Sequence, residues 1–325
     1  MKTSLVLSTY NGEKYIEEQL ESLDRQTRKL DHVLILDDRS TDGTVAIIRN
    51  YIEKHGLTDW VIKVNEKNQA WMKNFWSGLR QSEGDIIFLC DQDDIWDYHK
   101  IEIMTKVMEE NPDIQLLASG FNPKYEEGNI QKVSPVISKT MNNTGEIKKV
   151  DFSPSFMYVL RPGCTYALRA GLWKRCDEFW SENIPHDAML WRQALLEDGL
   201  YTIDLPLIQW RRYNTNTSNP YRSKDKYQNV DIMLYHNILD GVIKDDIVYA
   251  SRLLAYIEKH QEISWGEKLD IVKNCFAYQK ALEKAFEKKS LIDMGIIFLK
   301  YRKYFYAFRT YVRYVLTILK VKKYK

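Results

Sequence analysis

Residues 86–94 read Ile-Ile-Phe-Leu-Cys-Asp-Gln-Asp-Asp, an apolar run that ends in three acidic side chains. Five consecutive apolar residues predict a strand that is buried on both faces. Such a strand delivers Asp91, Asp93 and Asp94 to one point, where their carboxylates repel each other unless a cation lies between them. Asp91 and Asp93 are two residues apart, so on an extended chain they point the same way and can share one ion. A hard cation that prefers oxygen ligands, Mg²⁺ or Mn²⁺, is the expected occupant.

Strands and helices alternate over the first hundred residues. The pattern predicts strands at 4–9, 33–36, 60–64 and 86–90, and helices at 15–26, from 44 onward and at 71–81. Strand–helix–strand units at this spacing form a parallel sheet with helices on both faces. We therefore predict an α/β fold with a mainly parallel, Rossmann-like sheet.

Polar residues follow three of these strands. Thr9-Tyr10-Asn11 follows the first strand, Asp37-Asp38 the second, and the acidic group the fourth. Because ligands of such sheets bind beyond the carboxyl ends of the strands, the three loops converge on one rim. A simpler interpretation of the acidic group is a turn that caps the next helix, with Asp97 as N-cap. The convergence of the loops favours the cation site.

A later segment supplies candidate acid–base groups. Pro185-His186-Asp187 opens a predicted helix that runs through Leu196. The dipole of a helix N-terminus favours a carboxylate, so Asp187 is the candidate base, although N-capping is the commoner role of an aspartate there. His186 is a weaker candidate, because a lone histidine is more often structural or a supporting group.

We expect a metal, rather than a glycine-rich loop, to bind phosphate. The chain contains neither GxGxxG nor GxxxxGK[ST]. A metal held by carboxylates can bind phosphates instead, and that combination suits a nucleoside diphosphate as leaving group. Arg211 and Arg212 follow a predicted short strand at 205–210 and offer planar forks of donors to the same diphosphate. The alternative is a pair of ordinary surface arginines.

The overall composition excludes several classes of protein. With 325 residues and a net charge of +2, the chain holds one large domain or two modest ones and is no generic nucleic-acid binder. Its four cysteines form no CxxC pair, which predicts a reduced, cytosolic chain without a disulfide framework or a zinc site. We expect no signal peptide, because the sequence starts with a predicted strand, and no spanning helix, because no stretch of eighteen uncharged apolar residues occurs.

Four motifs together resemble the inverting glycosyltransferases of family 2, which have the GT-A fold. The motifs are Ser8-Thr9-Tyr10-Asn11-Gly12, residues 37–44 (Asp-Asp-Arg-Ser-Thr-Asp-Gly-Thr), Gly84-Asp85 and residues 91–96 (Asp-Gln-Asp-Asp-Ile-Trp). The resemblance covers residues 1 to about 215. The last motif, the Gly163-Cys164-Thr165 turn and the His186-Asp187 pair are also similar to bacterial rhamnosyltransferases, which build cell-wall, capsule or O-antigen polysaccharides from dTDP-L-rhamnose.

This resemblance implies roles for the residues of the rim. The residues that would bind the nucleotide are Thr9, Tyr10, Asn11, Glu13, Asp37, Asp38, Asn68 and Asp91. Asp38 would hold the base or the ribose, with Asp37 behind it. Asp91 and Asp93 would be the ligands of Mn²⁺ or Mg²⁺.

The resemblance also implies how the sugar is transferred. Arg211 and Arg212 would contact the diphosphate of the donor. Asp187 would deprotonate the acceptor hydroxyl, which attacks the anomeric carbon opposite the diphosphate and inverts it. The residues that would face the sugar or the acceptor are Asp94, Trp96 and His186.

Two residues depart from the pattern of this branch. Members often carry a histidine after the late strand, where it can complete the metal site, and this chain has Tyr213 there, a poor ligand when neutral. A glycine usually stands third in the segment that here reads Asn68-Gln69-Ala70. The first departure puts the coordination of the metal in question.

The end of the chain is basic and rich in aromatic residues. From Ile296 to Lys325 there are nine Lys or Arg and no Asp or Glu. A basic amphipathic helix over 295–325 suits an anionic membrane surface. The alternatives are a helix docked on the catalytic domain and a nucleic-acid arm. We favour the membrane, because acceptors of the family are often lipid-linked and the segment is too polar to span a bilayer.

These observations predict a GT-A catalytic domain at 1–218, a helical region at 219–294 and the C-terminal helix at 295–325. The helical region offers either a contact for a homodimer or an acceptor site, and the sequence leaves both open. The expected function is metal-dependent transfer of L-rhamnose from dTDP-L-rhamnose to a lipid-linked or growing cell-surface polysaccharide, in the cytoplasm at the inner face of the cell membrane. The alternatives are a UDP-hexose transferase of the same fold and an inactive membrane-bound scaffold.

Overall fold

The computed structural model describes residues 1–325 except 130–132, 134, 139, 183, 214–229 and 324–325. The chain forms two compact units, one of Met1–Asp151 with Val159–Asn214 and one of Phe152–Tyr158 with Thr215–Lys325. The boundary predicted between residues 218 and 219 lies outside the described residues. The sheet belongs to the first unit, and the second unit is helical.

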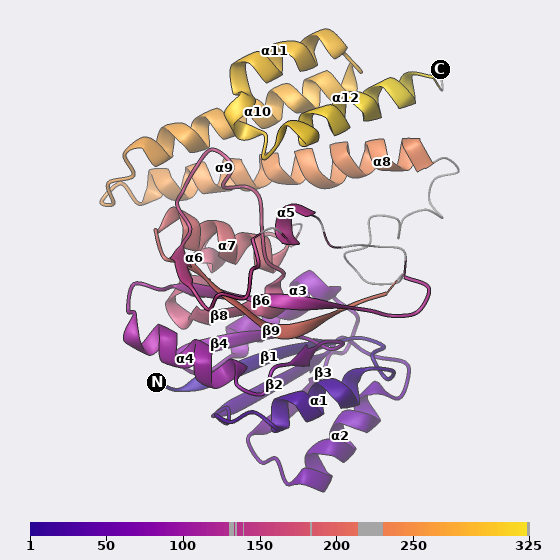
Figure 1. The fold of residues 1–325 in the computed structure, drawn as a ribbon, viewed down its shortest axis with the longest axis vertical. Coiled ribbons are helices and arrows are strands. Elements are labelled where there is room, and N and C mark those ends of the chain that lie inside the picture. Colours follow the sequence, from indigo (N-terminus) through magenta and orange to yellow (C-terminus); the bar gives the residue numbers. More distant parts are fainter. Residues whose placement is uncertain (130–132, 134, 139, 183, 214–229, 324–325) are drawn as a thin grey trace. The chain divides into compact units, whose positions relative to one another are not determined.

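Strands of the described residues form one mixed sheet in the order β3-β2-β1-β4-β8-β6-β9-β5, with β7 paired to β9 (Figure 1). The strands are β1 (Thr3–Thr9), β2 (His32–Asp37), β3 (Trp60–Val64), β4 (Ile86–Asp91), β5 (Ile95–Trp96), β6 (Leu116–Tyr125), β7 (Ile147–Lys149), β8 (Tyr166–Arg169) and β9 (Leu200–Arg212). β1 runs parallel to β2 and β4, and β2 runs parallel to β3. The α/β fold class that the alternating pattern predicts is confirmed.

β4 is the buried strand that the apolar run predicts. All residues of 86–90 are fully buried. The register pairs Asp91 at the end of β4 with Ser8 of β1, and it pairs Thr9 of β1 with Asp37 of β2. The three polar loops therefore leave neighbouring strands at the same level of the sheet.

Helices cover both faces of the sheet. The helices of the first unit are α1 (Ile16–Asp24), α2 (Thr44–His55), α3 (Trp71–Gln81), α4 (Lys100–Glu110), α5 (Pro135–Ser138), α6 (Ala170–Asp177) and α7 (His186–Leu196). Leu20 of α1 and Ile48 of α2 join the core formed with Leu5 of β1. α3 contacts β1 from the opposite face, where a Cβ on Gly78 would collide with the side chain of Val6. Glycine at this position permits the close approach.

Two local features differ in detail from the sequence patterns. α4 begins at Lys100 with His99, rather than Asp97, as N-cap, and Asp97 Oδ1 accepts from the backbone N of His99 (2.9 Å) in the turn just before the helix. The residues between the acidic group and Asp97 instead form β5, which pairs antiparallel with β9. β9 is also longer than the predicted strand at 205–210, because it pairs with β6 along most of its length as well as with β5.

The second unit is built from helices α8 to α12. Their bounds are α8 (Val230–Ile238), a π-helical segment (Leu239–Ile243), α9 (Lys244–Lys259), α10 (Glu267–Glu287), α11 (Leu291–Tyr301), a 3₁₀ turn (Arg302–Tyr304) and α12 (Phe308–Lys322). Among the described helices, none combines the length and the apolarity needed to cross a bilayer.

The single helix predicted over 295–325 is divided in the structure. α11 ends at Tyr301, and α12 begins seven residues later, after the 3₁₀ turn. The break lets the rings of Tyr301, Tyr304 and Phe305 contact the ring of Tyr278 in α10, at centroid distances of 5.9, 5.8 and 5.1 Å. Burial of these aromatic side chains outweighs the continuity of the helix.

We expect the substitution Ala70→Gly to stabilise the protein. Ala70 precedes α3 with φ 67° and ψ 153°, a conformation that is nearly exclusive to glycine. Relief of this strain exceeds the added entropy of the unfolded chain, so urea titration should show a gain of about 1 kcal/mol in the free energy of unfolding. Gly78→Ala is the matched control and should destabilise. A loss of stability in Ala70→Gly would contradict the account.

Candidate active site

The loop after β1 is joined to the acidic loop by Gln92. Gln92 Oε1 accepts from the backbone N of Tyr10 (2.8 Å), and Gln92 Nε2 donates to the carbonyl oxygen of Tyr10 (3.1 Å). A Cβ on Gly12 would collide with this amide. Glu13 Oε2 accepts from the backbone N of Gly43 (2.7 Å) and ties the same loop to the start of α2. Gln92 thus holds the loop after β1 against the acidic loop. Its position in the motif does not reveal this role.

Asp37 and Asn11 hold the loop after β2. Asp37 is fully buried, and its Oδ2 accepts from the hydroxyls of Thr9 (2.8 Å) and Ser40 (2.6 Å). Asn11 Oδ1 accepts from the backbone N of Thr41 (2.8 Å). These polar groups are paired with one another, so they keep the ends of β1 and β2 in register.

Asp38 organises the approach to α3. Its Oδ1 accepts from Asn65 Nδ2 (2.9 Å) and from the backbone N of Gln69 (2.8 Å). Asn68 Nδ2 donates to the carbonyl oxygen of Asp38 (3.1 Å). The predicted nucleotide residues Asp38 and Asn68 are therefore neighbours.

The acidic loop meets a cysteine from a distant part of the chain. Asp91, Asp94 and Cys164 each offer a ligand atom, and these atoms lie within 4.8 Å of one another. Asp93 Oδ2 accepts a hydrogen bond from the hydroxyl of Tyr213 (2.5 Å). The structure thus groups Asp91 with Asp94 and Cys164, and Asp93, the second ligand that the sequence suggests, is not a member of this group among the described residues. The spacing of the acidic group could not predict that Cys164 lies beside Asp91 and Asp94.

Burial and mutual repulsion raise the pKa values of these carboxyl groups. Burial, followed by the charges of Asp93 and Asp187, raises the pKa of Asp91 to about 7. Burial, followed by the charges of Asp93 and Asp91, raises the pKa of Asp94 well above its usual value. Asp94 Oδ2 is buried without a hydrogen-bond partner among the described residues. A buried carboxylate oxygen in this state favours a proton or a cation beside it.

This donor set fits a divalent cation. Two carboxylates and a third nearby supply the oxygen ligands that Mg²⁺ and Mn²⁺ prefer. The thiol of Cys164 is a softer ligand, and its pKa is raised well above the usual value by burial and by Asp94 and Asp91. The thiol therefore keeps its proton, and the carboxylates are the residues that could hold the metal.

Lys100 brings a buried positive charge to the cluster. Its side chain is fully buried, and its Nζ donates to the carbonyl oxygen of Cys164 (2.8 Å) and lies 3.8 Å from the ring centroid of Trp96. Burial lowers the pKa of Lys100 to about 8. Trp96, predicted to face the sugar, is buried in the described structure, and its ring lies 6.0 Å from that of Phe88.

Arg211 supports the acidic loop from β9. Its backbone N donates to Asp94 Oδ1 (2.9 Å), and its Nε donates to the carbonyl oxygen of Asp93 (2.7 Å). Its guanidinium forms ion pairs with Glu18 and Glu126. Arg211 is therefore a buried support of the loop, with its charge balanced by two carboxylates.

Arg212 and Tyr213 follow Arg211 and lie near the same acidic loop. The guanidinium of Arg212 lies 4.3 Å from the ring centroid of Trp210. Burial, followed by the charge of Asp93, raises the pKa of Tyr213 above its usual value. Tyr213 is therefore a neutral phenol that donates to Asp93, at the position where the sequence resemblance leads us to expect a histidine.

Asp187 and His186 lie in the first turn of α7. Asp187 Oδ1 accepts from the backbone N of Ala188 (2.7 Å). A Cβ on Gly163 would lie 3.0 Å from Asp187 Cβ and from His186 Nε2, so the turn that carries Cys164 packs directly on this helix end. Asp187 also raises the pKa of Asp91. The turn of Gly163 and Cys164 therefore connects the predicted base to the acidic loop.

The ring of His186 is a buried wall. It stacks on Phe75 at 4.0 Å and meets the edge of Trp71 at 5.7 Å. Burial lowers the pKa of His186 to about 4, so the ring is uncharged at neutral pH. This environment favours a positioning role over acid–base chemistry.

Comparison with known proteins identifies the family of the chain. Residues 4–165, about half of the chain, match the family model described as Glycosyl transferase family 2. The dTDP-rhamnosyl transferase RfbG of Shigella flexneri is 27% identical over 240 residues, which cover 70% of this chain and 78% of that protein. The poly(ribitol-phosphate) beta-N-acetylglucosaminyltransferase TarS of Staphylococcus aureus is 36% identical over 96 residues, which cover 29% of this chain and 16% of that protein.

The fold is shared with a solved structure. The crystal structure of S. aureus TarS 1–349 in complex with UDP-GlcNAc matches with a TM-score of 0.57 and 19% identity, over 93% of this chain and 92% of that chain. The chain spans a third or less of the length of the first curated relatives that it matches. The chain belongs to glycosyltransferase family 2 and has the GT-A fold.

The raised pKa of Asp91 predicts a stability that depends on pH and on metal. A carboxyl whose pKa is raised to about 7 in the folded state holds a proton that the unfolded state has lost above about pH 4, so stability should fall as pH rises from about 4 to about 7. Mn²⁺ binds the ionised form, so it should raise the melting temperature more at about pH 8 than at about pH 5. Thermal unfolding with a chelator and with Mn²⁺ measures both effects. Asp91→Asn should flatten the profile, and an equal Mn²⁺ response at both pH values would contradict the site.

We expect Tyr213→His to bind Mn²⁺ about 10-fold more tightly than the natural chain, because imidazole is a metal ligand and a neutral phenol is not. Isothermal titration calorimetry provides the measurement. Tyr213→Phe is the control, since it removes the hydroxyl that donates to Asp93 and adds no ligand. Equal affinity in the His and Phe variants would show that position 213 does not face the metal.

Proposed function

We propose that this protein is a metal-dependent, inverting glycosyltransferase. The observation that carries the proposal is the cluster of Asp91, Asp93 and Asp94 at the carboxyl end of a parallel strand, with Asp187 close enough to raise the pKa of Asp91. Membership of family 2 supports it. The reaction transfers a sugar from a nucleoside diphosphate to a hydroxyl group of the acceptor.

The proposed donor is dTDP-L-rhamnose, and the proposed acceptor is a lipid-linked or growing cell-surface polysaccharide. The similarity to the dTDP-rhamnosyl transferase extends over 70% of the chain, which favours this donor over that of TarS, whose curated sequence aligns over 29%. The second candidate is a UDP-hexose such as UDP-glucose, UDP-galactose or UDP-N-acetylglucosamine. It is favoured by the fold shared with TarS in complex with UDP-GlcNAc.

The rim between β1 and β2 is the proposed nucleotide pocket. Its residues are Thr9, Tyr10, Asn11, Glu13, Asp37, Asp38, Asn68 and Asp91. The hydrogen bonds of Asp37 and Asn11 support a role in fixing the loops. The ring of Tyr10 is 45% exposed and is available to stack on the base, while Asp38 is assigned to the base or the ribose.

Asp91 and Asp93 are the proposed ligands of Mn²⁺ or Mg²⁺, with Asp94 beside them. When bound, the ion stabilises the negative charge that develops on the departing diphosphate. Arg211 and Arg212 are assigned to the same diphosphate, Arg211 through the acidic loop that it supports, because Glu18 and Glu126 already balance its charge. Arg211 keeps the acidic loop in place through its own hydrogen bonds, and Arg212 adds a second positive charge at the end of β9.

Asp187 is the proposed base. It accepts the proton of the acceptor hydroxyl while the oxygen attacks the anomeric carbon, and the bond from that carbon to the diphosphate breaks on the opposite side. One displacement of this kind inverts the configuration. Asp94, Trp96 and His186 are assigned to the side of the sugar and the acceptor, where the buried positions of Trp96 and His186 favour a positioning role.

The proposed place of work is the inner face of the cell membrane, where the second unit contacts an anionic surface. The nine basic residues between Ile296 and Lys325, without an acidic one, support this partner. The near-neutral charge of the whole chain argues against nucleic acid as a ligand. A homodimer through the helical region stays a prediction.

We expect Asp187→Asn to lower the turnover number by about 10²–10⁴-fold, because an amide cannot accept the proton of the acceptor. The affinity for the nucleoside diphosphate should be unchanged, since Asp187 does not touch it in the proposed mechanism. Steady-state kinetics and calorimetry separate the two quantities. Asp113→Asn, an exposed aspartate of the same unit, is the control. Unchanged turnover in Asp187→Asn would remove it from the mechanism.

The release of nucleoside diphosphate from a panel of donors tests the function as a whole. dTDP-L-rhamnose, UDP-glucose and UDP-N-acetylglucosamine are compared with Mn²⁺, with Mg²⁺ and with a chelator. Metal-dependent release from dTDP-L-rhamnose supports the proposal, and release only from a UDP-sugar moves the assignment to a UDP-hexose transferase. No release from any donor, with Asp93→Ala unchanged in every respect, would favour the inactive scaffold.

A further inference from the structure

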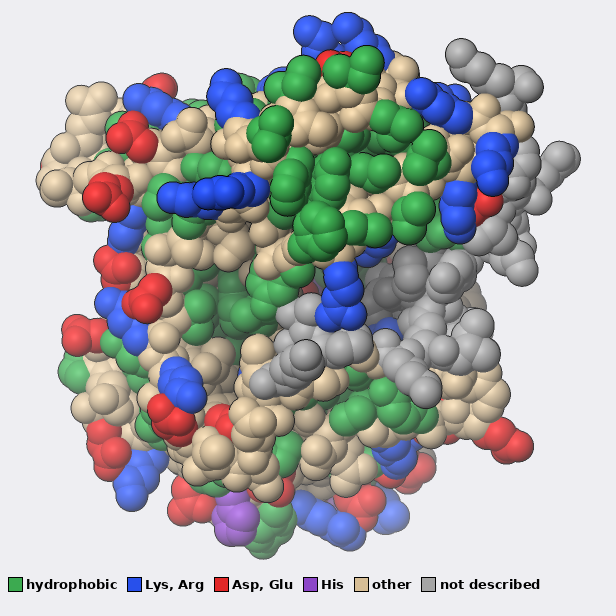
Figure 2. All heavy atoms as spheres, turned by 45° about the horizontal axis from the view of Figure 1, so that its top comes forward, with side chains coloured by type: hydrophobic (Ala, Val, Ile, Leu, Met, Phe, Trp, Pro, Cys, Tyr) green, Lys and Arg blue, Asp and Glu red, His purple; other side chains and the backbone are tan. Residues whose placement is uncertain are grey.

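α11 presents an apolar stripe to solvent. Ile292, Ile296 and Leu299 are 79%, 56% and 80% exposed, and they share one face of the helix at spacings of four and three residues. Phe308 at the start of α12 is 64% exposed, and its ring lies 5.7 Å from that of Phe298 in α11. Hydrophobic side chains gather on this face of the helical unit with Lys and Arg side chains around them (Figure 2). A patch of this kind indicates an interaction surface.

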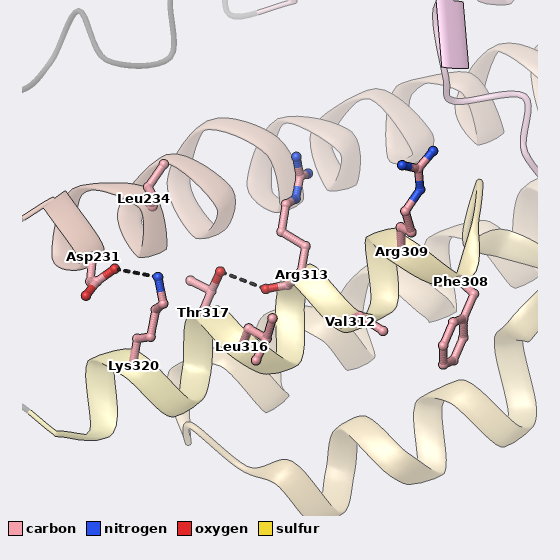
Figure 3. Close-up of a pocket in the computed structure, with 9 residues that line it drawn as sticks. All are labelled: Asp231, Leu234, Phe308, Arg309, Val312, Arg313, Leu316, Thr317 and Lys320. Atoms are coloured by element: carbon pink, nitrogen blue, oxygen red, sulfur yellow. Dashed lines mark hydrogen bonds and ion pairs between the residues drawn. The ribbon is translucent and has the colours of Figure 1, made fainter. Parts of the chain in front are cut away.

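A groove of about 510 Å³ lies between α8 and α12 of the same unit. Its apolar lining comes from Leu234 of α8 and from Phe308, Val312 and Leu316 of α12. Arg309 and Arg313 line the groove one helical turn apart and extend from the same side of α12 (Figure 3). The groove is therefore amphipathic, with an apolar lining and two neighbouring guanidinium groups.

The charge of this groove is positive. Its acidic lining residue, Asp231, is paired with Lys320 at 3.2 Å. Neither Arg309 nor Arg313 forms an ion pair with an acidic side chain of the described residues. Arg309 also lies in the first turn of the fifteen-residue helix α12, which has no acidic residue in that turn, so the helix dipole adds to the attraction for an anion.

We propose that the groove binds one anionic phospholipid of the bilayer, with the lipid phosphate against Arg309 and Arg313 and an acyl chain along the apolar lining, while the stripe of α11 lies in the bilayer interface. This inference rests on the membrane function proposed above and specifies how the surface is recognised. Guanidinium groups bind phosphate as planar forks of donors. Leucine, isoleucine and phenylalanine side chains beside basic residues are the composition of interfacial helices.

A second copy of the chain fits this face less well. An isologous dimer would place the same patch against itself and bring Arg309 and Arg313 close to their own copies. The acidic residue that lines the groove, Asp231, is paired with Lys320, and no acidic residue follows Ile296 to compensate that repulsion. The positive charge of the groove is complementary to an anionic lipid, which makes the lipid the better-matched occupant.

Two assays on the full chain separate the groove from the membrane surface as a whole. Flotation with vesicles of phosphatidylcholine, with or without phosphatidylglycerol, measures attachment to the surface. Calorimetry with dihexanoyl phosphatidylglycerol below its micelle concentration measures the groove, because no bilayer is then present. We expect the natural chain to bind the phosphatidylglycerol vesicles and the short-chain lipid, and to bind phosphatidylcholine vesicles more weakly.

The double variant Arg309→Glu/Arg313→Glu should lose about 10-fold or more in affinity for the short-chain lipid and for anionic vesicles, because each removed cation weakens attraction to an anionic surface. Leu316→Trp should fill the groove and abolish binding of the short-chain lipid while leaving the arginines in place. Lys284→Glu/Lys288→Glu is the matched control, since these exposed lysines have the same spacing in the same unit and do not line the groove.

Each outcome supports or overturns the inference. Donor turnover and melting temperature should be unchanged in all three variants, which shows that they fold. Vesicle binding without any binding of the short-chain lipid would overturn the proposal that the groove binds lipid, and it would support attachment of the unit to the membrane surface. A dimer in light scattering that Arg309→Glu/Arg313→Glu disrupts, without lipid binding, overturns both and assigns the face to a second copy. Equal lipid affinity in the groove variants and the control also overturns the groove.

Discussion

Three like charges at the end of a strand buried on both faces are the constraint on which the catalytic unit depends. Water cannot stabilise them there, so the protein must supply opposite charge, donors or protons. Lys100 is buried beside the loop, Arg211 binds it through both backbone and side chain, and Tyr213 donates to Asp93. Lys100 comes from α4, Arg211 from the end of β9, and Tyr213 directly follows that strand. The acidic loop therefore decides how distant parts of the chain are brought together.

The same constraint links stability to function. The carboxyl groups raise each other's pKa values, so the site without a cation is a source of instability in the folded state. Strain at Ala70 adds to it on the other side of the rim. Functional sites commonly lower the free energy of unfolding in this way. Burial of the apolar strands β1, β2 and β4 offsets that loss. A donor and a metal that bind only the folded state would raise its stability.

The features that sequence could predict are those with a local pattern. The buried strand, the parallel order around it and the convergence of three loops follow from runs of apolar residues and from the direction of the chain. The sequence did not predict the roles of Gln92, Lys100 and Cys164 in the site. Their roles arise from contacts between residues 64 to 82 positions apart, and a glutamine, a lysine or a cysteine carries no local signal of such a contact. The break between α11 and α12 escaped for the same reason, because tertiary packing around Tyr278 overrides helical propensity.

The phosphorus resonances of a bound nucleoside diphosphate give the most direct test of the central claim, which is that these carboxylates hold a metal against the diphosphate of the donor. Mn²⁺ is paramagnetic and broadens phosphorus signals only when it lies close to them. The account predicts that sub-stoichiometric Mn²⁺ broadens both phosphate signals of protein-bound nucleotide in the natural chain and fails to do so in Asp91→Asn/Asp93→Asn, each measured at a nucleotide concentration that saturates the protein. Equal broadening in the two proteins, or sharp signals in both, would contradict it.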